Sequence, residues 1–361
     1  MLRYVVLVAL FLYSVVSPVC AKENVIRPKN IIFLIGDGMG LSHISLCRNK
    51  FGKLNLERFK VCGFSNTRSL NSEVTDSAAG GTALSTGQRT NNTMVSMLPG
   101  NKPIDNILDY ALKKNLRTGV VVTCLLPHAT PADFTAHNSS RYNLEEIALE
   151  QSQSKALNIA IGGGLRYFRP TTAEQKGRKD NRNLIEEISF RKSVLFSYDE
   201  LKSFTGNDFM AFLADEHLPN ASTRKYTLGN LTEIAINNLK TSKNGFVLMV
   251  EGSQIDTESH SNKAYKMIYE LKDFDTAVKV ALDFAEKDKN TLVVVTADHE
   301  TGGLTLPENK APFKSRATIE FSTSHHTGSM VPVFAFGPGS EYFAGIQQNF
   351  EIGQKLINFI K

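Results

Sequence analysis

The sequence predicts a three-layer α/β/α fold built around a large, mainly parallel central sheet. Strand-length runs that are almost entirely apolar recur along the chain, and patterns with helical spacing separate them. Such runs are typical of strands buried on both faces, and their alternation with helices is typical of parallel sheets. The 361 residues are enough for one large α/β domain or two smaller ones.

The strands are expected where apolar runs meet a breaking signal. The first run, 31–35, is β-branched and aromatic and ends at G-D-G-M-G, the run 157–161 stops at three glycines, and the run 331–336 closes at G-P-G. The remaining runs are 120–123, 246–250 and 292–296. Because each run is almost entirely apolar, we expect it inside the sheet.

Helices are expected between these strands. The periodic segments are 104–114, a helix beginning at 144–149, 227–239, 264–285 and 352–360. Residues 166–219 are polar, basic in the middle and weakly periodic. We interpret them as an insertion packed against the main sheet, within a single catalytic domain over 22–361.

Residues 1–21 have the pattern of a signal peptide. Arg3 supplies a positive charge, residues 4–16 are apolar, and V-C-A at 19–21 is a small-residue cleavage site. The apolar run is too short to span a bilayer comfortably, and no later stretch suits a transmembrane helix. We therefore expect an exported protein, periplasmic or secreted, with no membrane span.

The net charge bears on the binding partners of the protein, and the cysteine content bears on its disulfides. The net charge of +5 is spread out except at 176–182, and no aromatic residues interleave with that cluster, so nucleic-acid binding is not supported. Cys47 and Cys62 could close a short disulfide in an exporting compartment. Because three cysteines follow residue 21, an odd number, the pairing stays open. Cys124 ends an apolar run and is expected to be a buried thiol.

Residues able to carry chemistry follow the predicted strands repeatedly. In parallel α/β sheets, ligands bind at the carboxyl ends of the strands. The residues at these ends are Asp37 after the first strand, His128 and Thr130 after the second, Glu251 and Asp256 after the fourth, and Asp298 and His299 after the fifth. A turn or a surface ion pair could explain any one of them, but the repetition indicates a metal centre.

The spacing of these residues favours particular metals. Asp256 and His260 are separated by four positions, so on a helix they face one way and can share an ion, and His325 or His326 could add an imidazole. Asp298 and His299 are adjacent at a strand end that the following T-G-G breaks. Aspartate with histidine suits zinc.

Oxygen donors point to a second kind of metal. Glu251 ends an apolar strand, where an unpaired carboxylate is costly. It needs a partner, which could be a salt bridge or a hard cation such as Mg²⁺. Thr130 offers a further oxygen, so these two residues together suit magnesium.

A candidate nucleophile precedes a small apolar segment. Asp76 and Ser77 are good helix N-caps, and small apolar residues follow them. Ser77 would lie where backbone N–H groups and the positive end of the helix dipole point outward. A nearby zinc pair could then deprotonate its hydroxyl and make it a nucleophile. Arg141 has the fork-shaped head that suits phosphate oxygens. Taken alone, the segment favours an ordinary capped helix.

Six motifs occur in one order from about residue 29 to residue 339: G-D-G-M-G, V-T-D-S-A-A-G-G-T-A-L-S-T-G, H-A-T-P-A with H-N-S-S-R, V-E-G-S-Q-I-D-T-E-S-H, T-A-D-H-E-T-G-G and H-H-T-G. As a set, they resemble those of the alkaline phosphatase family. The resemblance implies two Zn²⁺ and one Mg²⁺ per chain, an alkaline phosphatase-like fold, and hydrolysis of small-molecule phosphate monoesters. Because the family is usually dimeric, it also implies a homodimer.

The resemblance implies a role for each matching residue. Ser77 resembles the nucleophile that becomes a phosphoserine, and Arg141 resembles the phosphate-binding arginine. The implied metal ligands are Asp37 bridging zinc and magnesium, Thr130 and Glu251 for magnesium, Asp256, His260 and His326 for one zinc, and Asp298 and His299, with Ser77, for the other. His326 is preferred to His325 because the family's ligand directly precedes this T-G.

Three further residues are expected to support the site. His128 stands where the best-studied bacterial member has an aspartate near magnesium, and Thr257 where others have lysine or histidine. Asp76 either caps the helix or positions Arg141. The alternatives to a phosphatase are a phosphodiesterase or sulfatase of the same superfamily, or a non-catalytic exported protein that binds phosphate or metal. Residues 74–87 lack the C/S-x-P-x-R string that a sulfatase needs.

Overall fold

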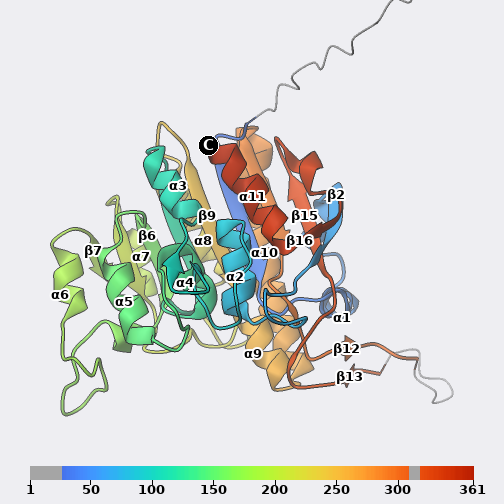
Figure 1. Cartoon of the computed structure of the whole chain (residues 1–361), viewed down its shortest axis with the longest axis horizontal. Coiled ribbons are helices and arrows are strands. Elements are labelled where there is room, and N and C mark those ends of the chain that lie inside the picture. The colour runs from blue at the N-terminus through green and yellow to red at the C-terminus, as the bar shows by residue number, and fades with distance from the viewer. Residues whose placement is uncertain (1–26, 309–317) are drawn as a thin grey trace, which may run out of the picture.

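The computed structural model describes residues 27–308 and 318–361, which contain a ten-stranded central sheet (Figure 1). Its strands are β1 Asn30–Gly36, β2 Val61–Asn66, β5 Arg117–Leu125, β6 Ile159–Gly163, β7 Ser193–Leu195, β8 Phe209–Phe212, β9 Phe246–Gly252, β10 Thr291–Thr296, β15 Val331–Phe336 and β16 Gly345–Gln348. They lie in the order β16-β2-β15-β10-β1-β9-β5-β6-β8-β7. The first strand of the chain is therefore at the centre of the sheet.

The sheet is mainly parallel, as the sequence predicts. From β10 through β1, β9, β5, β6 and β8 to β7, each neighbouring pair is parallel. Among the described strands of this sheet, β15 is the exception, since it runs antiparallel to both β10 and β2. The chain between β10 and β15 forms no crossover helix in its described part, and parallel pairing requires such a crossover.

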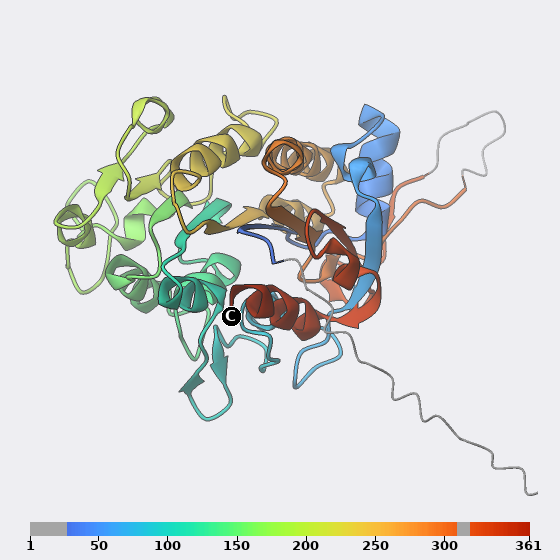
Figure 2. The same cartoon turned by 90° about the horizontal axis from the view of Figure 1, so that it is seen from above.

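Helices cover both faces of the sheet, so the three-layer fold class is confirmed (Figure 2). The helices are α1 Leu41–Phe51, α2 Ser77–Thr86, α3 Ile107–Lys113, α4 Ala129–Thr135, α5 Leu144–Gln153, α6 Leu184–Ser189, α7 Tyr198–Ser203, α8 Leu228–Leu239, α9 Gln254–His260, α10 Ala264–Asp288 and α11 Asn349–Ile360. In β1, Ile32 and Leu34 face a core with α1, α8 and α10. Phe33 and Ile35 face the opposite core, with α2, α3, α4 and α11.

The polar segment 166–219 is more closely integrated than a layer packed against the sheet. It contributes β8 and β7, which extend the sheet beyond β6 in parallel register. Helices α6 and α7 flank these strands, and Ile188 and Leu201 from the two helices are buried in opposite cores. The segment therefore supplies one edge of the sheet.

Two elements near the N-terminus were not predicted, because their sequences lack a clear apolar pattern. Strand β2 alternates exposed and buried side chains, as a strand near a sheet edge does, so it lacks a continuous apolar run. Helix α1 buries only His43 and Cys47 completely, so its periodicity is weak. Both elements lie on the side of the sheet where β15 reverses direction.

The cysteines beyond the first 26 residues are unpaired. Cys47 is buried, Cys62 is exposed, and Cys124 is buried as expected. The predicted signal peptide over residues 1–21 lies outside the described residues. No helix in the described ranges has the length and hydrophobicity needed to cross a membrane.

Candidate active site

The predicted site residues gather at the edge where the parallel strands end, the lower edge in Figure 1. Asp37 follows β1, Glu251 lies near the end of β9, and Asp298 follows β10. In the described part of the chain, three groups of side chains each place their ligand atoms within 4.8 Å of one another. The first group is Asp256, His260 and His326, the second is Asp37, Asp298 and His299, and the third is Cys124, His128 and Glu251.

The first group joins helix α9 to the short strand β14 (His326–Thr327). Oδ2 of Asp256 lies 3.3 Å from Nε2 of His260. Nε2 of His326 lies 3.1 Å from Nε2 of His260 and 3.6 Å from Oδ1 of Asp256. The Nδ1 atom of each ring bonds to a backbone carbonyl oxygen. Both rings therefore present Nε2 to the space beside Asp256, so the three side chains could bind one metal ion.

Two residues near this group lie apart from it. His325, the alternative to His326, is exposed and belongs to none of the three groups. Thr257 is exposed on α9.

Burial lowers the pKa of His326 to about 4. Its ring is therefore uncharged at neutral pH, which is the form of histidine that binds a metal ion.

The second group surrounds His299 with carboxylates. Nε2 of His299 lies 3.1 Å from Oδ2 of Asp298 and 3.5 Å from Oδ1 of Asp37. The Ser77 hydroxyl lies 3.2 Å from the same nitrogen. All four side chains are buried. The candidate nucleophile therefore lies directly beside the second group.

Buried oxygen atoms without partners indicate that this region accommodates cations. Both carboxylate oxygens of Asp37, Oδ2 of Asp298, Oε1 of Glu251 and Oγ1 of Thr130 have no hydrogen-bond partner. Burial, and then the charges of neighbouring carboxylates, raise the pKa of Asp37 well above its ordinary value. Buried carboxylate oxygens that accept no hydrogen bond are costly, so the donor sets present fit bound divalent metals.

Ser77 is placed by the first turn of α2. Asp76 is the N-cap, and its Oδ1 accepts a hydrogen bond from Ala79 N at 3.0 Å. Gly81 lies close against α4, since a Cβ there would be 2.1 Å from Oδ2 of Asp133. The small residues predicted to form this helix thus allow α2 to pack tightly beside α4. This packing fixes the position of the Ser77 hydroxyl.

Asp76 both caps α2 and holds Arg141, so the two roles left open by the sequence are combined. Its Oδ2 accepts a hydrogen bond from Arg141 Nη1 at 3.2 Å and another from Thr93 N at 3.0 Å. Nη2 of Arg141 approaches Nε2 of His128 at 3.5 Å. The guanidinium is thereby held on the same side of the site as Ser77.

Replacing Asp76 separates its two roles. Asp76→Ala is expected to lower the free energy of unfolding by about 1 kcal/mol through loss of the cap, whereas Asp76→Asn retains a capping oxygen. Both variants release Arg141, and ordering a flexible side chain costs about 0.5–1.5 kcal/mol. KM for a phosphate monoester should therefore rise by about 2- to 10-fold in both. Steady-state kinetics and urea unfolding measure the two effects, and an unchanged KM in both variants would exclude the positioning role.

The third group contains residues that sequence reasoning did not assign to a metal. Cys124 was expected to be a core thiol, yet its Sγ lies 3.4 Å from Oε2 of Glu251. His128 contributes a ring nitrogen to the group. Thr130 lies beside Glu251. His217 packs edge-on against His128 with ring centroids 5.7 Å apart. Because His217 lies in a polar, weakly periodic segment, no sequence signal distinguished it.

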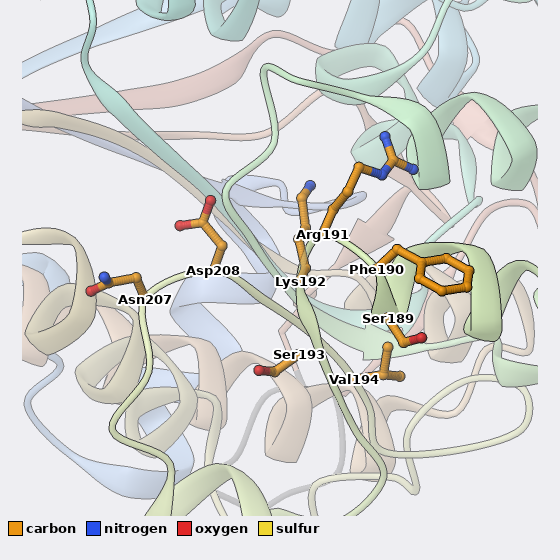
Figure 3. Close-up of a pocket in the computed structure, with 8 residues that line it drawn as sticks. All are labelled: Ser189, Phe190, Arg191, Lys192, Ser193, Val194, Asn207 and Asp208. Carbon is orange, nitrogen blue, oxygen red and sulfur yellow. The ribbon is translucent and has the colours of Figure 1, made fainter.

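A hollow of about 630 Å³ lies elsewhere, beside β7 and β8 (Figure 3). Its cationic side chains already have partners, since Arg191 donates to the Ser152 carbonyl and Lys192 to the Leu157 carbonyl. It shares no residue with the three groups. The hollow is therefore separate from the three groups at the carboxyl ends of the strands.

Comparison with known proteins agrees with this geometry. The sequence profile described as alkaline phosphatase matches residues 28–314. The chain belongs to the alkaline phosphatase family. Alkaline phosphatase 4 of Bacillus subtilis is 31% identical, over 94% of this chain and 90% of the relative. The alkaline phosphatase of Escherichia coli is 30% identical, over 90% and 84% respectively.

A solved alkaline phosphatase has the same fold. The structure from the Antarctic bacterium TAB5 is 40% identical and superimposes with a TM-score of 0.86, covering 92% of this chain and 98% of that one. The resemblance drawn from the six motifs is therefore confirmed. Alkaline phosphatases are metal-dependent phosphoric monoester hydrolases, which is consistent with the buried groups described above.

Proposed function

We propose that this chain hydrolyses phosphate monoesters to an alcohol and inorganic phosphate, with Ser77 as the nucleophile. The observation that carries the proposal is the position of the Ser77 hydroxyl. It lies at the first turn of α2, 3.2 Å from Nε2 of His299. Arg141, held by Asp76, is available to bind phosphoryl oxygens.

The donor sets suggest which residues hold the metals. We propose that the first and second groups each hold a Zn²⁺, with Ser77 as a ligand at the second. For the third group the sequence favours Mg²⁺ through Thr130 and Glu251, and the family resemblance adds Asp37 as a ligand shared with the second group. Bound zinc would lower the pKa of a coordinated hydroxyl and stabilise charge on the phosphoryl oxygens.

The residues of the chain then carry the reaction in two steps. The Ser77 hydroxyl gives up its proton to solvent, and Oγ forms a bond to phosphorus as the bond to the ester oxygen breaks; the leaving alkoxide takes a proton from solvent and departs as the alcohol. Arg141 donates two hydrogen bonds to the phosphoryl oxygens and so keeps phosphorus in line with Oγ. Water then attacks the phosphoserine, which releases inorganic phosphate and restores the Ser77 hydroxyl. The N-terminus of α2 favours the negative charge that builds up.

We also propose an exported location and a homodimer. The signal-peptide pattern over residues 1–21 supports export to the periplasm or the medium. Ile346 on the edge strand β16 is 70% exposed and pairs in register with Phe64, which is 39% exposed. Such an apolar edge is suited to contact with a second copy. Light scattering on the purified mature chain tests the dimer, and a monomeric mass at working concentration would contradict it.

A comparison of three esters tests the activity. The chain should hydrolyse p-nitrophenyl phosphate faster than bis-p-nitrophenyl phosphate or p-nitrophenyl sulfate. The diester lacks one charged oxygen for Arg141, and a hydrogen bond to a charged group contributes about 1.5–3 kcal/mol, so the preference should be about 10-fold or more. Faster hydrolysis of the diester or the sulfate would favour the alternative enzymes. No hydrolysis by zinc-loaded protein would favour a binding protein.

A further inference from the structure

The third group contains a thiol, which distinguishes it from an all-oxygen magnesium site. Cys124 and Glu251 both lie near the ends of adjacent parallel strands, β5 and β9. Val122 is in register with Glu251, and Cys124 is two residues further along the strand. Since side chains alternate across a strand, Cys124 and Val122 share the face on which Glu251 projects. The register of the sheet therefore places Sγ beside the carboxylate.

Two further donors come from the start of helix α4, and both lie close to Glu251. His128 is the N-cap of α4, and Thr130 is in the first turn of that helix. Nδ1 of His128, Oγ1 of Thr130 and Oε1 of Glu251 are buried and have no hydrogen-bond partner. The cluster thus offers a sulfur, a nitrogen and two oxygens. Three of these four atoms lack a partner within the protein, which indicates a ligand and not merely a cysteine in the core.

The chemistry of these donors selects the metal. Magnesium requires oxygen ligands and keeps much of its water, whereas thiolate and imidazole favour zinc and related transition metals. A sulfur that stayed protonated would instead donate to Oε2 of Glu251, as it does at 3.4 Å without a metal. In that case Cys124 would only position Glu251. The two roles differ in whether sulfur bonds to the metal.

We propose that the third site binds zinc, or another divalent metal with affinity for thiolate, through Cys124, His128 and Glu251, in place of magnesium. On binding, the thiol of Cys124 loses its proton to solvent and the sulfur bonds to the metal. The inference rests on the proposed function for the presence of a third metal. It gives that metal a different identity from the one that the oxygen donors alone suggest.

Cobalt substitution tests the sulfur bond without relying on activity. The full mature chain is stripped of metal and reloaded with Co²⁺, and cobalt content is measured alongside the absorption spectrum. Wild type should show a thiolate-to-cobalt charge-transfer band. Cys124→Ser should lose the band, and Cys62→Ser, which removes an exposed thiol remote from the site, should keep it. A fully cobalt-loaded wild type without the band, or a band that persists in Cys124→Ser, would overturn the proposal.

A second measurement uses only the wild-type chain. After equilibration with equal excess Zn²⁺ and Mg²⁺, elemental analysis should find zinc and no magnesium. Magnesium retained in proportion to the chain would overturn the proposal. Hydrolysis of p-nitrophenyl phosphate by the same samples tests the proposed function separately. A cobalt–thiolate band in an inactive protein would support the proposed third site and contradict the proposed phosphatase activity. Activity without the band would support the phosphatase activity and contradict the proposed third site.

Discussion

Ser77→Ala is expected to reduce kcat for p-nitrophenyl phosphate by on the order of 10⁴-fold or more, since loss of a nucleophile removes the covalent route. The change deletes one buried oxygen beside His299 and leaves the cap on Asp76 intact. Alanine also favours the helix. Although Ser77 is one proposed ligand, Asp37, Asp298 and His299 remain at the second group, so we expect folding and metal content to be retained and the loss to reflect chemistry.

The control for this variant lies on the same helix. Ser85 is also buried in α2, and its hydroxyl donates to the Thr82 carbonyl at 3.3 Å. Ser85→Ala should lose about 1 kcal/mol of stability at most and keep its turnover. Phosphoserine trapping at low pH with labelled substrate should mark Ser77 in wild type. Label on another residue, or wild-type turnover by Ser77→Ala, would refute the assignment of the nucleophile.

Removing divalent metals should abolish activity and markedly destabilise the fold. A site that is saturated at 100-fold above its Kd stabilises the native state by about 2.7 kcal/mol, and three such sites act on the same native state. Chelation also leaves the three buried carboxyl groups of Asp37, Asp298 and Glu251 close to one another without the metal charge that would offset their repulsion. Calorimetry with and without a chelator measures the loss, and zinc should restore both the melting temperature and turnover.

The destabilisation should depend on pH in a defined direction. Burial raises the pKa of Glu251 from 4.5 to about 7 in the metal-free fold. The folded state then holds this proton more tightly than the unfolded state, so metal-free stability should fall as the pH rises from about 4.5 through 7.

Asp37→Asn removes one buried carboxyl group from this cluster and should make the metal-free chain more stable than the metal-free wild type. Equal melting temperatures with and without chelator would contradict the metal assignment.

Strand ends were the most predictable part of the molecule. Asp37, Glu251 and Asp298 could be grouped from the sequence because each follows a run that is apolar throughout, and parallel strands end at one edge. Parallel pairing of β1 with β9 and β10 brings these ends together. Asp256 and His260 could be paired because helical spacing alone fixes their relation. The direction of β15 could not be predicted, because an apolar run has no orientation.

The residues of the site region that were missed lacked any local signal. Cys124 continues an apolar run, so nothing in its pattern separates a metal-facing thiol from a core residue, and only the register of β5 on β9 reveals it. His217 belongs to the segment that carries β7 and β8, whose polar composition concealed its strands. The residues whose roles depend on tertiary contact are thus the ones that a one-dimensional pattern cannot assign.

The central position of β1 also constrains the order in which the protein can form during synthesis. Its first partners are Ile31 with Val247 on one side and Ile31 with Leu292 on the other. Most of the chain must therefore be synthesised before β1 can pair with β9 or β10. Until then, the apolar residues of β1 have no partner strand in the sheet. Such long-range pairing is slow and prone to aggregation. His326, the last of the grouped ligands to be made, belongs to the same late segment, so the metal centre can be completed only after nearly the whole chain has emerged.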